Sequence, residues 1–246
     1  MLQSLRSRLG RKLRPRREVT VSTQDDLVEL AHWIDRPPLR LMVPPGLLRM
    51  QGAFIYDPGH PFVSALAEGE IALRRFYADC RPRTICEYYG LDAGERIGGD
   101  LPPWEIPWYG RTNRTPPPGE LALGAEHGVS FYGPVTDQKI GLELDRLHRL
   151  HAAIGRNGYD PDAHGDIEGY ILNDGTGAAF FVRGGKHRAA VLTALGHDRI
   201  PVAFRPSFPR MVHAADSALW PLVRAGAMEF SLAKEILEAY IRGRTQ

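Results

Sequence analysis

The residues best suited to chemistry lie in one short turn, Gly184-Gly185-Lys186-His187-Arg188. The two glycines let backbone amides come close to a ligand, and the helix that follows starts with unpaired N–H groups. The three basic side chains add positive charge. The turn therefore predicts a site for an anion such as a phosphate. The alternative is that the diglycine only shapes a bend between a strand and a helix.

Two further segments contain candidate residues. The loop 159–166 is rich in carboxylates, and Asp166, nearest the strand that follows, is the candidate for binding a magnesium ion or a substrate. The same residues are also ordinary turn formers. Residues 100–119 contain six prolines together with Trp104, Trp108 and Tyr109. This segment predicts a loop over a ligand, with Trp108 in contact with the substrate, or aromatic rings packed onto the protein body.

The pattern around the turn predicts the elements that position it. Apolar residues repeat at helical spacing from Ile140 to Ile154, and Gly158 follows as a stop signal. Residues 168–172 and 178–182 predict a hairpin, a helix follows the turn to Leu195, and residues 200–204 predict a strand. The local order is therefore helix, strand, strand, helix, strand.

The rest of the chain predicts a mainly helical N-terminal region over residues 18–99. Its elements are helices over 24–34, 61–77 and 84–89 and a strand over 39–43, and residues 207–246 form a C-terminal helical segment with a helix over 231–242. The proline-rich residues 100–125 form the boundary between this region and the core. The fold class predicted is α/β.

The run GGKHRAAVLTALGHDRIPV, residues 184–202, resembles the core signature of the ParB/sulfiredoxin superfamily. The order of elements before it also matches, so that the resemblance covers residues 126–206. It implies a mixed-sheet ParB/sulfiredoxin-like core. It also implies that Gly184, Gly185, Lys186, His187 and Arg188 bind the phosphates of ATP or another nucleotide.

Relatives of this kind have three activities. The sulfiredoxin-like reductases have a cysteine where this chain has Lys186, so the thiolate nucleophile is missing. The ParB proteins continue into a DNA-reading domain, for which the segment after residue 204 is short. The chain is most similar to the free-serine kinases, which implies a phosphotransferase with Mg²⁺, a small-molecule hydroxyl as acceptor, and Glu143 and His187 as catalytic residues, Glu143 being the base. The alternative for Glu143 is a surface carboxylate paired with Arg146 or Lys139.

The distribution of charge along the chain indicates which binding partners to expect. Residues 1–17 contain seven of the 31 Lys and Arg residues and no acid, so the remainder of the chain is net negative, which argues against a broad nucleic-acid-binding face. Leucines at helical spacing in this basic arm predict contact with a membrane surface or a partner, or else a frayed terminus. A nucleotide-binding switch or a ParB-like regulatory protein is the non-enzymatic alternative.

Cysteine usage and hydropathy predict the setting. The two cysteines, Cys80 and Cys86, are too few for a disulfide framework. No apolar run is long enough to span a bilayer, and no secretory signal precedes residue 18. We therefore expect a cytoplasmic protein, at most peripheral to a membrane. His148 and His151 lie three residues apart as metal ligands can, but no third ligand at a suitable spacing joins them, so a packed helix face explains this pair better.

Overall fold

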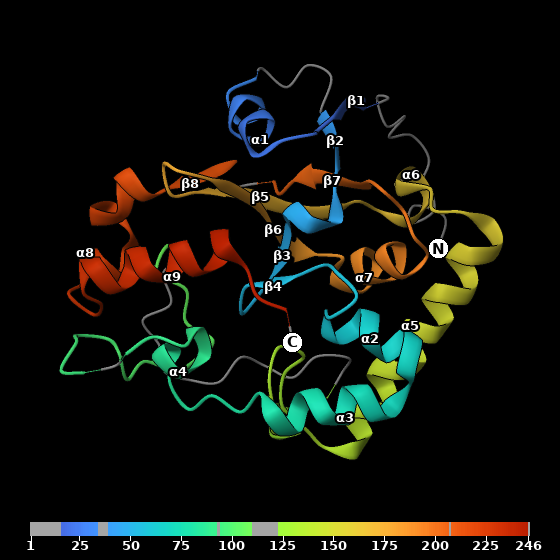
Figure 1. Ribbon diagram of the computed structural model, residues 1–246, viewed down its shortest axis with the longest axis horizontal. Helices are drawn as coiled ribbons and strands as arrows, with labels where there is room; N and C mark the ends of the chain where they lie inside the picture. Colours follow the sequence, from blue (N-terminus) through green and yellow to red (C-terminus); the bar gives the residue numbers. More distant parts are fainter. Residues whose placement is uncertain (1–15, 34–38, 93, 110–122, 207, 246) are drawn as a thin grey trace, which may run out of the picture.

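One mixed β-sheet forms the centre of the protein in the computed structural model, which describes residues 16–33, 39–92, 94–109, 123–206 and 208–245 (Figure 1). Seven of its eight described strands follow the order β1-β2-β7-β5-β6-β3-β4, and the eighth, β8, pairs with the part of β5 that β7 leaves open. The strands are β1 (Arg17–Thr20), β2 (Leu39–Val43), β3 (Leu48–Met50), β4 (Phe54–Ile55), β5 (Ile167–Asn173), β6 (Ala178–Gly184), β7 (Ile200–Phe204) and β8 (Met211–His213). The predicted α/β class is confirmed. Residues 1–15, which hold most of the basic arm and all of its regularly spaced leucines, lie outside the described residues, as do residues 110–122.

Helices cover the sheet and pack on one another. They are α1 (Gln24–Ala31), α2 (Pro61–Glu68), α3 (Glu70–Asp79), α4 (Ile85–Tyr89), α5 (Asp137–Asn157), α6 (Pro161–His164), α7 (Lys186–Ala194), α8 (Pro221–Arg224) and α9 (Phe230–Arg242). Short 3-10 turns occur at Pro45–Leu47, Ala125–His127 and Ala214–Leu219. Helices α2, α5 and α7 pack against each other, whereas α9 lies against β5 and β6 (Figure 1).

Local signals explain most of these boundaries. Thr23 and Asp26 form a capping box at the start of α1, and Gly90 ends α4 in the left-handed conformation. The single helix predicted over residues 61–77 is wrong. The structure has two helices there, because the chain turns at Gly69 with φ of +78°, and each helix then buries its own apolar face.

The N-terminal region is not only helical. It supplies β1, β2, β3 and β4 to the sheet, with β2 antiparallel to β7 and β3 parallel to β6. Of these, the sequence predicted only β2. The other three are two to four residues long. A run this short does not show from its sequence which strand it will pair with. Residues before and after the proline-rich segment therefore share one sheet.

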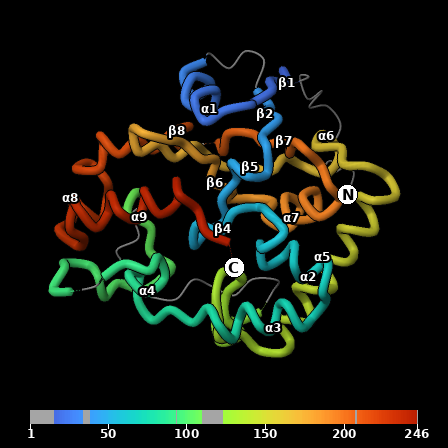
Figure 2. Tube along the Cα trace, viewed as in Figure 1, coloured from blue at the N-terminus to red at the C-terminus, as the bar shows by residue number. Residues whose placement is uncertain are grey.

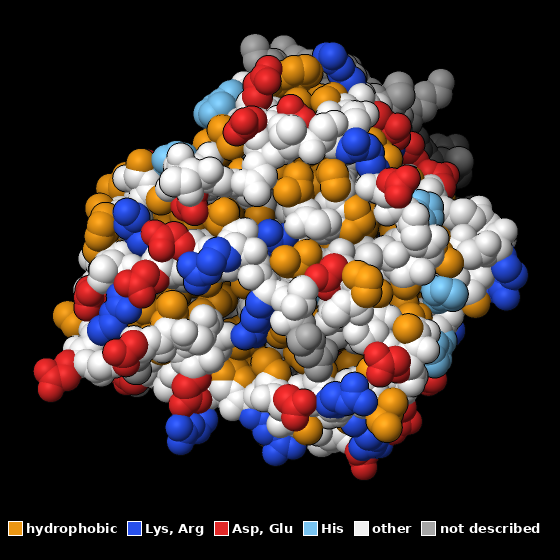
Figure 3. Space-filling view, in the orientation of Figure 1, with side chains coloured by type: hydrophobic (Ala, Val, Ile, Leu, Met, Phe, Trp, Pro, Cys, Tyr) orange, Lys and Arg blue, Asp and Glu red, His pale blue; other side chains and the backbone are white. Residues whose placement is uncertain are grey.

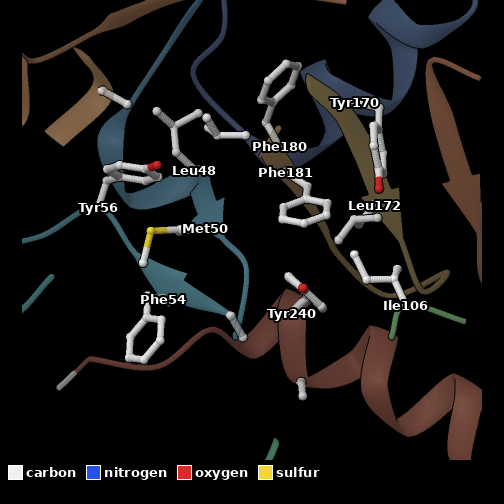
Figure 4. Packing of buried hydrophobic residues seen from close by; sticks show 14 of the residues in the cluster. Leu48, Met50, Phe54, Tyr56, Ile106, Tyr170, Leu172, Phe180, Phe181 and Tyr240 are labelled. Carbon is white, nitrogen blue, oxygen red and sulfur yellow. The ribbon is translucent and has the colours of Figure 1, made fainter. Parts of the chain in front are cut away.

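A buried aromatic cluster holds the part of β6 from which the diglycine turn emerges. The ring of Phe181 on β6 lies 5.4 Å from that of Tyr170 on β5 and 4.9 Å from that of Tyr240 on α9 (Figure 4). Each of these side chains is almost completely buried. Burial of a large apolar side chain contributes about 1.5–3 kcal/mol, so the cluster fixes this end of the strand firmly.

The end of the chain returns to the sheet. After α9, Arg244 lies beside β4, where its N–H donates to the carbonyl of Ala53 at 2.8 Å and its carbonyl accepts from Ile55 at 3.0 Å (Figure 2). Across the described ranges, no helix combines the length and the apolar character that crossing a bilayer requires. On the face drawn in Figure 3, acidic and basic side chains are interspersed.

Candidate functional site

A cavity of about 850 Å³ lies where the diglycine turn meets α5. The first turn of α7 and the end of β6 form one side of it, and the C-terminal half of α5 forms another. The proline- and tryptophan-rich segment closes a third side. Its volume is in the range of sites that hold a nucleotide or a drug-sized ligand. The lining residues are Gln51, Trp104, Glu105, Ile106, Tyr109, Val129, Phe131, Arg146, Arg149, Leu150, Ala153, Ile154, Asn157, Gly158, Tyr159, His164, Val182, Arg183, Gly185, Lys186, His187 and Arg188.

The electrostatic character of this lining is strongly basic. It contains four arginines and Lys186, whereas Glu105 is the one carboxylate among the lining residues that the structure describes. Positive charges that share a concave, partly dehydrated surface attract anions and interact with them more strongly than they would in water. The cavity therefore favours an anionic ligand with an apolar portion.

The diglycine turn has the geometry expected from the sequence. Gly184 is the last residue of β6, and Gly185 adopts φ of +81° and ψ of 22°, which redirects the chain into α7. A Cβ on Gly185 would lie 3.1 Å from Cα of Ile167, so a side chain there would be strained and crowded. Gly185 lines the cavity but Gly184 does not.

The start of α7 leaves hydrogen-bond donors available at the cavity. No side chain caps the helix, and within the described ranges the amides of His187 and Arg188 donate to no protein acceptor. Both residues line the cavity. The turn thus presents backbone N–H groups and the positive end of a helix dipole to whatever enters.

A buried ion-pair network lies directly behind this turn. Glu143 on α5 is completely buried, and its carboxylate accepts hydrogen bonds from Ser130 and from Nε2 of His187, the latter at 2.5 Å. Nζ of Lys139, one turn earlier on α5 and also completely buried, lies 2.9 Å from the carboxylate. The ring of His187 stacks on Phe62 of α2 at 4.8 Å. Four segments of the chain therefore fix the orientation of one imidazole.

The same network sets the protonation states. Burial raises the pKa of Glu143, but the hydrogen bond from His187 and the charge of Lys139 outweigh it and hold the pKa below its usual range. Burial lowers the pKa of His187, and the opposing effect of Glu143 is smaller. Because a carboxylate only accepts, Nε2 carries the proton of a neutral ring and Nδ1 keeps a lone pair.

The side chains of Lys186 and Arg188 differ in their roles. Nζ of Lys186 lies 4.3 Å from the ring centroid of Phe131, on the cavity wall. The guanidinium of Arg188 donates to three backbone carbonyls of the preceding loop, those of His164 at 2.6 Å, Gly165, and Asp166 at 3.1 Å. Arg188 therefore anchors the loop 164–166 to the turn. Part of its hydrogen-bonding capacity is used by these carbonyls rather than left for a ligand in the cavity.

Two of the predicted residues lie away from the cavity. The carboxylate of Asp166 is held by Arg40 at 3.1 Å and by Arg16 at 2.9 Å, and Asp166 is not a lining residue. Trp108 is buried, and its indole N–H donates to the hydroxyl of Tyr170 at 2.9 Å. It belongs to the core rather than to the cavity wall, because its polar atom finds an internal partner there.

Glu143 also differs from its expected placement. It is neither a surface carboxylate nor a lining residue, since its partners Ser130, Lys139 and His187 surround it. The structure does join it to the turn, through His187. Trp104 and Tyr109, from the same segment as Trp108, do line the cavity, which agrees with the first of the two alternatives for that segment.

Several lining residues were not predicted from the sequence. Arg183 directly precedes the diglycine, and Arg146 and Arg149 lie three residues apart on α5. A run of basic residues extending back from the turn was the one available signal for Arg183. Glu105 and Gln51 gave no signal, because only the folding of distant segments brings them to the cavity.

The described residues contain no group of three or more His, Cys, Asp or Glu side chains that could hold a metal ion. Neither a known family model nor a curated protein matches the chain. The resemblance to the ParB/sulfiredoxin superfamily therefore stays a prediction.

Proposed function

We propose that the protein is a nucleotide-dependent phosphotransferase that acts on a small-molecule hydroxyl. The observation that carries the proposal is the joint presence, in one cavity, of a helix start with available amides and of an imidazole that is oriented by a buried carboxylate. The first feature suits a polyphosphate, and the second suits removal of a proton from an alcohol.

The donor phosphates would bind at the start of α7. The amides of His187 and Arg188 and the ammonium of Lys186 supply donors and positive charge, in the way that anions are held at other helix N-termini. The apolar part of the lining, which includes Ile106, Leu150 and Val182, accommodates the less polar base and sugar.

In the reaction, Nδ1 of His187 accepts the hydroxyl proton. The hydroxyl oxygen forms a bond to the terminal phosphorus of the donor, and the bond from that phosphorus to its bridging oxygen breaks. The electron pair of the broken bond leaves with the nucleoside diphosphate. The products are a phosphate monoester and the diphosphate, and His187 later releases its proton to water.

In this scheme Glu143 is a positioning residue rather than the base. Its carboxylate fixes the tautomer and the orientation of His187 and stabilises the imidazolium formed during proton transfer, as the carboxylate does in a Ser-His-Asp triad. Direct action of Glu143 on the acceptor would require it to leave three buried partners. The resemblance to the free-serine kinases supports a catalytic glutamate, and the geometry favours this indirect role for it.

Mg²⁺ enters as part of the nucleotide substrate in this proposal. The cavity lining offers one carboxylate, that of Glu105, and Asp166 is engaged by two arginines. The residues therefore do not form a resident magnesium site, and the ion that accompanies the nucleotide neutralises phosphate charge.

The test is turnover of ATP in the presence of Mg²⁺, with and without glycerol as a hydroxyl acceptor. We expect slow release of ADP that accelerates with glycerol. His187→Gln should retain ATP binding and lower the rate by about 10²–10⁴-fold, the range for loss of a general base. His197→Gln, at an exposed histidine following the same helix, is the matched control and should be unchanged.

Two outcomes would contradict the proposal. ATP binding without any turnover would favour the non-catalytic nucleotide switch. Absence of nucleotide binding, checked by calorimetry on the full chain with ATP, ADP and CTP, would exclude both functions.

A further inference from the structure

A second basic side chain among the lining residues, that of Arg183, is held by several contacts. The guanidinium of Arg183 lies over the ring of Tyr109 at 4.9 Å and near that of Phe181 at 5.4 Å. Its Nη1 donates to Oε1 of Gln51 at 3.4 Å, at the long end of a hydrogen bond. Arg183 is half-buried and lines the cavity. Side chains from three separate segments therefore hold one guanidinium in a fixed place.

The wall behind Arg183 is a stack of aromatic rings. Tyr109 stacks on Phe208 with ring centroids 5.6 Å apart, and Phe208 stacks on Tyr170 at 4.2 Å. Tyr170 in turn accepts the hydrogen bond from the buried indole of Trp108. This aromatic stack preorganises the guanidinium, so a ligand that binds Arg183 does not have to order a long flexible side chain.

Among the described residues, no carboxylate balances the charge of Arg183. Within the described ranges no Asp or Glu lies within ion-pair distance of it, and its Nε is buried without an acceptor. The nearby rings offset part of this cost through their negative faces. A half-buried guanidinium in a basic cavity still gains most from an anion.

The contact with Gln51 also selects the kind of partner. Oε1 of Gln51 accepts from Arg183, which leaves the NH₂ group of this buried amide as a donor beside the guanidinium. Two neighbouring donors of this kind match the two oxygens of a carboxylate or of a phosphate.

We infer that Arg183 and Gln51 form an anion subsite for the acceptor, so that the hydroxyl substrate itself has a carboxylate or a phosphate group. The inference rests on the proposed function, in which the donor phosphates occupy the start of α7. The two side chains that contact Arg183 in this subsite, those of Tyr109 and Gln51, belong to neither α7 nor α5.

The test compares glycerol, glycerate and glycerol 3-phosphate, which share hydroxyl groups and differ in their anionic group. Calorimetry on the full chain measures each affinity with and without a saturating non-hydrolysable ATP analogue and Mg²⁺. We expect glycerate or glycerol 3-phosphate to bind at least ten-fold more tightly than glycerol. The anion that binds identifies which of the two groups the subsite takes.

Variants assign the difference to Arg183. In Arg183→Gln the advantage of the anion should fall below two-fold, while the affinity for the ATP analogue changes by less than two-fold. Arg183→Lys keeps the positive charge but lacks the planar guanidinium, so it should retain part of the tighter binding of the anion. This variant also tests the subsite if Arg183→Gln does not fold. Arg156→Gln, an exposed arginine on α5 outside the cavity, is the matched control.

The result can overturn this inference independently of the proposed function. Equal binding of glycerol and the two anions, or an unaltered anion advantage in Arg183→Gln, excludes the subsite while nucleotide binding stands. A large loss of affinity for the ATP analogue in Arg183→Gln also excludes it, since the anion would then belong to the donor. An anion advantage without any nucleotide binding retains the subsite and rejects the phosphotransferase.

Discussion

Replacement of Glu143 by glutamine tests the buried network on which the site depends. Glu143 and Lys139 are both completely buried, with Nζ 2.9 Å from the carboxylate. Glutamine preserves the shape of the side chain but removes its negative charge, so Lys139 remains buried without the charge of Glu143. Loss of one member of a buried ion pair typically costs about 3–5 kcal/mol.

The expected loss is large relative to the stability of a domain, which is about 5–15 kcal/mol. For a protein of this size each kcal/mol lowers the melting temperature by about 2–4 °C, so Glu143→Gln should melt about 6–20 °C below the wild type. Urea unfolding followed by circular dichroism gives the free energy directly. Asp145→Asn, at an exposed carboxylate two residues along the same helix, is the control and should change stability by less than about 0.5 kcal/mol.

A double variant separates charge from packing. In Lys139→Met with Glu143→Gln, both members of the buried ion pair lose their charge, and most of the lost stability should return because an apolar group tolerates the buried environment. The reasoning would be refuted if Glu143→Gln alone lost less than about 1 kcal/mol. It would also be refuted if the double variant were no more stable than the single one.

Two further predictions concern pH and the turn. His60 is buried, and burial lowers its pKa to about 3, so its contribution to stability is complete above pH 6.5 and is lost as the pH falls towards 3, at up to about 1.4 kcal/mol per pH unit. His60→Asn should flatten the dependence of unfolding free energy on pH in this range, and His148→Asn, at an exposed site, should leave it unchanged. Gly185→Ala should lower stability by about 1–3 kcal/mol because of its positive φ, whereas Gly184→Ala, whose new Cβ meets nothing closer than 3.7 Å, should be tolerated; equal losses in thermal melts would argue against a strained turn.

The sequence by itself determined the features that depend on neighbouring residues. The turn 184–188 and the cap of α1 by Thr23 follow from residue type and short-range hydrogen bonds, and so do the span of α5 and the hairpin of β5 and β6. Local patterns failed where the backbone changed direction within an apolar run, as at Gly69. They failed as well for strands of two to four residues, which have too few side chains to display a period.

Only the tertiary structure decided which side chains meet at the cavity. Glu143 is 44 residues from His187, and Arg183 is more than 70 residues from Tyr109, so no local spacing could indicate that either pair is in contact. Trp108 and Asp166 had the residue types of a binding site, yet internal partners satisfy both, Tyr170 for the indole and two arginines for the carboxylate. A polar side chain binds whichever partner the fold brings within hydrogen-bond distance, and that choice depends on the packing of segments far apart in the chain.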